Sequence, residues 1–429
     1  MAQTASLFAD IVNSFFPKLQ TLVEKINGRR EAPTYLHLQR LRKEYSADQK
    51  WESATVNTAY VAADMVALDS PLPLKERPTL SAANGTLPKI GMKKFLNETQ
   101  LNSLNIMRAQ GASYEDLVKR LMDDVTAVSR GVDEKNEYNF LAGLSNGVVA
   151  IADDAGENSA LRIRFNYPEE NSFGVETAGL LTLADLRRVM DKATADGNSV
   201  AEIWIAKSEY DRLRATREAR ELVATYNGQT FTSDASLPVP TATRFNEAFA
   251  DDTGGVAFVV VNRSVFVERD GRRSAVKPWN PSKVIMTMGG ELGALVWGTL
   301  AEATNPVDGV AYQTLDQYKL ISKYSKTDPL QEFTAAQALV LPVIENVDQI
   351  YSIDISEGEA VDAGAEGSDS GDTKTTIDGV AYDKASAVAF LNGAGASLAD
   401  GASDAEVIAA YNALSKSDRR AFASAVTKG

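Results

Sequence analysis

Hydrophobic residues recur at helical spacing over one long stretch after the first quarter of the chain. The positions that share a helix face are Leu117, Leu121, Val125, Val128 and Val132. Ser113 followed by Asp116 is a start signal, because each side chain can accept hydrogen bonds from the first free N–H groups. The pattern predicts a helix from Ser113 to Leu141, a rod of roughly 42 Å. Gly131 is expected to bend or interrupt it, and Gly143 to cap its end.

The first fifty residues carry two shorter amphipathic patterns. One helix face consists of Leu7, Ile11 and Phe15, and Pro17 ends this helix. A second helix is expected from Leu19 to Ile26, before Gly28. Residues 1–50 are therefore expected to form an arm.

Polar and apolar residues alternate between Val56 and Val66, and four prolines follow by Pro88. Proline cannot donate to a sheet ladder, so residues 51–95 are expected to form an extended two-stranded loop with exposed edges. Such edges are an aggregation hazard unless a neighbouring molecule covers them.

The middle of the chain predicts a compact mixed α/β domain. Thr182 and Asp185 form a capping box for one helix, and Ser208 is expected to cap the next, SEYDRLRATREARELV. Strands are expected at 148–152, 161–165, 200–206, 256–261 and 265–268. Asp270–Gly271 is a hairpin turn signal.

The last part contains a strand-rich segment, an acidic linker and a small module. Residues 277–355 are strands and glycine turns. The linker, 356–375, has low hydrophobicity and like charges, which keep a segment extended. Residues 376–429 are expected to form a helical module with helices at 385–391, 404–414 and 417–426.

Composition leaves little catalytic equipment. The chain has 429 residues, no cysteine and a single histidine, His37, which excludes disulfides, thiolate nucleophiles and zinc fingers. His37 lies in a basic amphipathic stretch and is expected at the surface or in an interface. No nucleotide-binding loop or calcium loop occurs. We predict no catalytic, cofactor-binding or metal-binding residues and no cofactor.

The net charge is −14 and is unevenly distributed. Residues 354–372 hold seven carboxylates and no basic residue, whereas basic residues gather in 18–50 and in the predicted hairpin, at Arg263, Arg269, Arg272, Arg273 and Lys277. Because these basic patches lack interleaved base-stacking aromatics, subunit contacts are the expected use. Apolar runs are far shorter than the ~20 residues of a membrane span. The start of the chain has no secretory signal pattern, so synthesis in a cytoplasm and no membrane partner are expected.

Four segments resemble the major capsid proteins of tailed bacteriophages, specifically the major capsid protein E family with the Hong Kong 97-type fold. They are FLNETQLNSLNIMRAQGASYEDLVKRLMDDV, EIWIAKSEYDRL, PWNPSKVIMTMGG and TDPLQEFTAAQALVLPVIENVDQIY. The resemblance covers about residues 1–355 and depends mainly on the order of the elements. It implies an α+β fold whose parts are an N-terminal arm (1–50), an E-loop (51–95), a P-domain with a long spine helix (96–174), an A-domain (175–300) and a P-domain return (301–355). The linker (356–375) and the small helical C-terminal module (376–429) lie outside the basic pattern.

The resemblance implies a structural protein without enzymatic activity. Its partners would be other copies in pentamers and hexamers, scaffolding and portal proteins, a decoration protein, and packaged double-stranded DNA bound non-specifically. Its location would be the virion capsid, assembled in the cytoplasm of a host bacterium. Two alternatives remain at this stage: an encapsulin-like compartment shell, and a carboxylate-dependent α/β enzyme, which would need a pocket with convergent acids.

Overall fold

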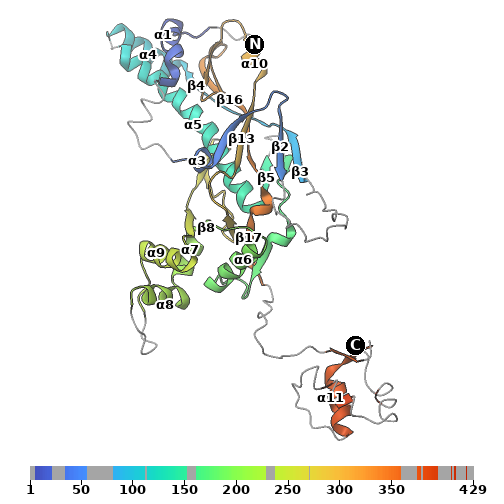
Figure 1. Ribbon diagram of the computed structural model, residues 1–429. Coiled ribbons are helices and arrows are strands. Elements are labelled where there is room, and N and C mark those ends of the chain that lie inside the picture. The colour runs from blue at the N-terminus through green and yellow to red at the C-terminus, as the bar shows by residue number, and fades with distance from the viewer. Residues whose placement is uncertain are drawn as a thin grey trace, which may run out of the picture. The chain divides into compact units, whose positions relative to one another are not determined.

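The computed structural model describes residues 5–21, 34–55, 81–111, 114–151, 161–228, 237–269, 271–358, 374–377, 380–394, 407, 410, 411 and 422. The chain divides into two compact units, Met1–Glu359 and Ala360–Gly429 (Figure 1). Helices and strands are both abundant in the first unit, so the predicted α+β class is confirmed.

The predicted long helix is α5, Tyr114–Asn146, 33 residues long. It passes through Gly131 and Gly143, so the predicted cap at Gly143 is wrong, and Gly147, with φ 65°, follows its end. Both internal glycines lie where another element comes close. A Cβ at Gly143 would lie 2.9 Å from the Phe165 ring, and one at Gly131 would meet Met92. Ser113 lies outside the described residues.

Helix α5 packs along the main sheet of the first unit. The sheet order is β1-β13-β16-β15-β14, and β4 also pairs with β16. Only β1 and β13 are parallel; the other pairs are antiparallel. The strands are β1 (Leu41–Tyr45), β4 (Lys89–Asn97), β13 (Gly293–Gly298), β14 (Ala311–Leu315), β15 (Lys319–Thr327) and β16 (Leu330–Ile344).

The N-terminal segment packs on this core through α1 (Ala9–Phe15) and the 3₁₀ turn η1 (Phe16–Lys18). The predicted stripe is wrong at Leu7, which is 46% exposed, because Phe8 and Val12 face the core beside Ile11. The Phe15 side chain and most of the predicted helix Leu19–Ile26 lie outside the described residues. Helix α3, Leu36–Arg40, leads into β1.

Segment 51–95 is described in part. Strands β2 (Lys50–Thr55) and β3 (Ser81–Thr86) form an antiparallel pair, and residues 56–80 between them lie outside the described residues. Trp51 is buried in the core of the first unit. Strand β4 belongs to the main sheet, and α4 (Glu98–Ala109) follows it, with Asn97 and Gln100 forming a capping box.

A second sheet of the first unit has the order β7-β17-β12-β8-β9. One face carries Ile203, Ile205, Val284 and Met286 toward its helices, whereas Trp204 and Ile285 join the core around α5. The strands are β7 (Ser172–Val175), β8 (Glu202–Ala206), β9 (Ala257–Val261), β12 (Lys283–Thr287) and β17 (Tyr351–Gly358). The helices are α6 (Leu183–Ala195), α7 (Lys207–Arg214), α8 (Arg217–Tyr226) and α9 (Ala242–Thr253).

Two predictions about these helices have different outcomes. The capping box of Thr182 and Asp185 is confirmed at the start of α6. The predicted Ser208 cap is wrong, because α7 already begins at Lys207 and has no side-chain cap. The single helix predicted there is divided in two, since the Thr216 side chain caps the start of α8.

Two hairpins and several short elements complete the first unit. The hairpin predicted around Asp270–Gly271 is formed by β10 and β11, and Gly271 has φ 71°, whereas Asp270 lies outside the described residues. The elements are β5 (Val148–Ile151), β6 (Leu161–Arg164), η2 (Glu169–Asn171), β10 (Val265–Arg269), β11 (Arg272–Val276), α10 (Ala301–Thr304) and η3 (Val347–Gln349).

The second unit has a core of its own. The predicted helix at 385–391 is confirmed as α11, Lys384–Gly393, but a hairpin of β18 (Lys374–Ile377) and β19 (Val380–Asp383) precedes it and was not predicted. The buried residues are Tyr382, Ala387, Val388, Leu391, Val407, Tyr411 and Phe422. Most of the predicted linker, 359–373, lies outside the described residues.

Candidate assembly surface

The single histidine of the chain is completely buried, so its predicted surface or interface position is wrong. His37 Nδ1 lies 2.7 Å from Oε2 of Glu137, and both side chains are fully buried. The Glu137 carboxylate also accepts hydrogen bonds from the backbone N–H groups of Leu36 and His37. Glu137 therefore caps the start of α3 and fixes it to α5, because the first N–H groups of a helix have no partner within it.

The pKa of Glu137 reflects this structural role. Burial acts to raise the pKa, but the hydrogen bonds from the His37 ring and the two backbone N–H groups outweigh it, so the pKa is lowered. Near it on α5, Asp133 binds the buried Lys319 Nζ at 2.7 Å. Burial nevertheless raises the pKa of Asp133, against the effect of Lys319. These groups are engaged with one another and join α5 to β15 and α3.

Lys323 is a second buried lysine, and no carboxylate oxygen of the described residues lies within 4.0 Å of its Nζ atom. Lys323 is fully buried and its ammonium group donates to Thr334 Oγ1 at 2.9 Å. Burial lowers the pKa of Lys323, against the raising effect of Glu332 and Asp124. The group lies inside the packed layer between the main sheet and α5, away from the hollow described next.

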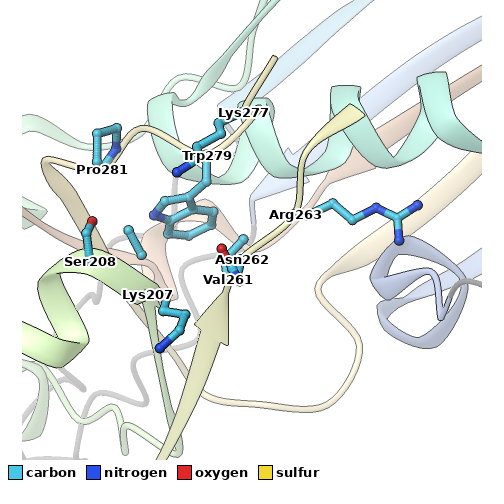
Figure 2. Close-up of a pocket in the computed structure, with 9 residues that line it drawn as sticks. Lys207, Ser208, Val261, Asn262, Arg263, Lys277, Trp279 and Pro281 are labelled. Carbon is cyan, nitrogen blue, oxygen red and sulfur yellow. The ribbon is translucent and has the colours of Figure 1, made fainter. Parts of the chain in front are cut away.

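A small hollow lies at the carboxyl ends of the parallel strands β8 and β9 (Figure 2). Its lining comprises Ala206, Lys207, Ser208, Val261, Asn262, Arg263, Lys277, Trp279 and Pro281. None of these residues carries a carboxylate. Figure 2 shows Arg263 pointing away from the other labelled side chains, and its guanidinium pairs with Glu134 at 2.6 Å. The hollow does not have the convergent acids that a carboxylate-dependent enzyme needs.

The described part of the chain offers neither a metal-binding cluster nor a membrane-spanning helix. There, no group of three or more His, Cys, Asp or Glu residues is placed to hold a metal ion. In the same residues, no helix combines the length and the apolar character needed to cross a bilayer. The expectation of no catalytic, cofactor or metal residues stays a prediction.

The β10–β11 hairpin of the first unit is largely exposed. No described strand pairs with the outer edge of β10 or of β11. All of β11 except Val276 is exposed, and Phe266 on β10 is 74% exposed. A two-stranded ribbon of this kind is marginally stable alone in water, so a contact that covers it would stabilise it.

Strand β4 presents a second open edge. It pairs with β16 on one side, and no described strand pairs with the other. Most of its residues are exposed, including Phe95 at 51% and Met92 at 37%. Lys89, Lys93 and Lys94 lie on the same strand. Edge lysines of this kind discourage unspecific strand pairing, whereas the apolar side chains offer contact area to a fitted partner.

The sequence predicts the basic hairpin and its use in subunit contacts, but Phe266 is not among the contact residues predicted from it. A signal for it exists in the alternation of VFVER, which puts Phe266 on the face opposite the buried Val265. An aromatic side chain on the outward face of a short strand offers a large apolar area to a neighbouring molecule. Cross-strand neighbours of that face are Ala275 and Arg273.

No family model matches the chain, and no curated protein matches it. Solved structures do. A proposed capsid protein of an E. coli CFT073 prophage has 14% identity and a TM-score of 0.47, covering 79% of this chain and 98% of that one. A phage-related protein from Bordetella bronchiseptica RB50 has 11% identity and a TM-score of 0.42, covering 84% and 100%.

The SrpI encapsulin from Synechococcus elongatus PCC 7942 is also similar, with 11% identity, a TM-score of 0.34, and coverage of 74% of this chain and 86% of that one. The first two of these solved structures are described as phage or prophage proteins, the class that the sequence resembles.

Proposed function

We propose that this chain is a shell subunit, the major capsid protein of a tailed bacteriophage. In this function it self-assembles into pentamers and hexamers of an icosahedral head that encloses double-stranded DNA. The single observation that carries the proposal is the β10–β11 hairpin, a two-stranded ribbon that pairs with no other described strand and carries the exposed Phe266 on its outer face.

The ribbon supports this function because it is unfavourable on an isolated molecule. Its two strands are joined to each other only, and its exposed aromatic and small side chains gain from burial, at about 25 cal/mol per Å² of apolar surface. The open edge of β4 adds a second surface of the same kind. Two different surfaces that meet complementary ones on neighbours make heterologous contacts, which close into rings.

The interior of the molecule supports a structural function. Its buried charged groups pair with each other or lie within packed layers, as His37 does with Glu137 and Lys319 with Asp133. The hollow at the ends of β8 and β9 has no carboxylate in its lining. The proposal therefore includes no enzymatic activity and no cofactor.

The expected partners follow from the proposed function. Other copies of the chain form the shell, and scaffolding, portal and decoration proteins bind to it. Double-stranded DNA would be enclosed without tight binding, because a net charge of −14 disfavours adhesion to phosphates. The protein would assemble in the cytoplasm of the host bacterium and remain in the virion capsid.

The test is assembly of the full chain, expressed alone and together with candidate scaffolding proteins. Size-exclusion chromatography with light scattering and negative-stain images should show pentamers, hexamers or closed particles. A stable monomer under every condition of salt, pH and crowding would overturn the proposal. Particles that enclose a protein cargo in place of DNA in the native host would assign the chain to the encapsulin-like alternative.

A further inference from the structure

The β10–β11 hairpin carries an excess of positive charge in an acidic protein. Residues 265–277 contain Arg269, Arg272, Arg273 and Lys277 against Glu268 and Asp270, which gives a net charge of +2. Arg272 and Lys277 are exposed, and Arg273 pairs with Glu268 at the surface, at 2.7 Å. The hairpin therefore combines cationic and apolar contact groups on one small ribbon.

The chain contains one stretch with the opposite character. Residues 357–372 hold Glu357, Glu359, Asp362, Glu366, Asp369 and Asp372 and no lysine or arginine. Between the acids lie small apolar residues, as in the sequence EAVDAGAE. Carboxylates that alternate with small side chains match a ribbon that carries Arg273 on the face of Phe266 and Ala275 and Arg272 on the other face.

We propose that the β10–β11 hairpin of one copy binds the acidic stretch 357–372 of a second copy. This inference rests on the proposed function, since it names the partner of a surface that the shell uses. Strand β17 ends at Gly358, and the residues from there to Asp372 can span at most about 50 Å when extended.

A protein partner fits this ribbon better than nucleic acid does. Glu268 lies on the same face as Phe266, one pair away, and is joined to Arg273. A carboxylate on that face repels phosphates, and a phosphate-binding surface needs clustered cations with stacking aromatics. An acidic peptide tolerates Glu268, because Arg272 and Lys277 remain available around it.

Cysteine cross-linking tests the contact directly, because the natural chain has no cysteine. One preparation carries Ser274→Cys in β11, and a second, differently tagged preparation carries Ser368→Cys in the acidic stretch. The two are mixed, assembled and mildly oxidised. We expect a disulfide-linked dimer that contains both tags. A matched pair of Ser103→Cys, exposed on α4, with Ser368→Cys should give at least tenfold less dimer.

Charge reversal then separates electrostatic recognition from chance proximity. The double change Arg272→Glu and Arg273→Glu in the Ser274→Cys chain should lower the cross-linked fraction at least fivefold. Raising the salt from 0.05 to 0.5 M, a change at which exposed charges are strongly screened, should lower it similarly in the unaltered hairpin. The changes Asp362→Lys and Glu366→Lys in the partner chain should restore the cross-linked dimer with the charge-reversed hairpin.

Three outcomes would overturn the inference. The first is the absence of the mixed dimer, and the second is a disulfide that forms only within one chain when that chain carries both cysteines. The third is that added DNA, but not assembly, protects the cysteine of Ser274→Cys from alkylation. If no particles form, the cross-link is scored in the soluble mixture. Its absence there overturns this inference, whereas the missing particles overturn the proposed function separately.

Discussion

Met92 on β4 occupies the place where a side chain at Gly131 of α5 would begin. A Cβ at Gly131 would overlap the Met92 Sδ atom. The missing side chain thus lets the edge strand cross close to the middle of the long helix. It also explains why a residue that weakens helices is found inside α5 without ending it.

We expect Gly131→Ala to leave the stability of the first unit nearly unchanged. The new methyl group forces the flexible, partly exposed Met92 side chain into another rotamer, which should cost about 1 kcal/mol, against a gain of about 1 kcal/mol in helix propensity. The urea midpoint should therefore stay close to that of the natural chain. In a Met92→Ala background the same change should raise the midpoint, because the space is then free and only the propensity gain remains. Equal effects in both backgrounds would contradict the packing explanation.

Glu137→Gln should be strongly destabilising, by about 3 kcal/mol at neutral pH, because it breaks a completely buried pair and removes an acceptor at the start of α3. Glu268→Gln, which removes an exposed pair with Arg273, is the matched control and should cost about 0–1 kcal/mol. Urea unfolding followed by circular dichroism compares the two.

The pH dependence of the Glu137 effect has a definite sign. Its folded-state pKa is lowered, so the charged carboxylate contributes stability above the unfolded pKa of about 4.3. That contribution is lost as the pH falls through the lower folded pKa. The difference in stability between the natural chain and Glu137→Gln should therefore shrink below about pH 4.3. A difference that stays constant to pH 2 would show that the carboxylate charge is not involved.

Replacing residues 56–80 by Asn-Gly should abolish assembly and leave the molecule folded. Thr55 and Ser81 are already cross-strand partners, so a two-residue turn closes β2 on β3 without moving the buried Trp51. Removal of all of 51–95 would instead take β4 out of the main sheet. Near-UV circular dichroism should be unchanged and particles absent in negative stain. Normal particles from this variant would refute the sequence-based expectation that a neighbouring molecule covers the exposed edges of 51–95.

A chain that ends after Asp372 should fold and still assemble. It keeps strand β17, which ends at Gly358, and the acidic stretch 357–372, and the second unit has a separate hydrophobic core around Phe422. Ending the chain at Asp354 would remove the pairing of Gly358 with Val175. The melting temperature of the shortened chain should stay within a few degrees of that of the full chain. Insoluble or monomeric protein would show that the second unit is needed by the first.

Local sequence signals predicted several elements correctly. The capping box at Thr182 and the turn at Asp270–Gly271 depend on hydrogen bonds and backbone conformations within a few residues, so a short window contains all the information. The same holds for the repeated apolar face of α5. The Ser208 cap failed because Lys207 already continues from β8 into a helix.

Positions that depend on distant partners could not be predicted in this way. The polar neighbours of His37 in the sequence favour a surface position. Glu137, one hundred residues away, supplies the hydrogen-bond partner that offsets the cost of burying His37. Likewise, glycine often ends a helix, and Gly143 was expected to do so. It lies inside α5, where the Phe165 ring leaves no room for a larger side chain. The alternation in VFVER places Phe266 opposite Val265, but only the pairing of β10 with β11 alone leaves that face exposed.

The sequence by itself determined the α+β class, the long helix, the charge segregation between the hairpin and the 354–372 stretch, and the lack of thiol chemistry. Those properties depend on composition and short-range spacing alone. Only the tertiary structure decided that His37 is interior, that β4 completes the chain's own sheet, and that β10–β11 stands exposed. Burial and strand pairing arise from contacts between residues far apart along the chain, and no local pattern encodes them.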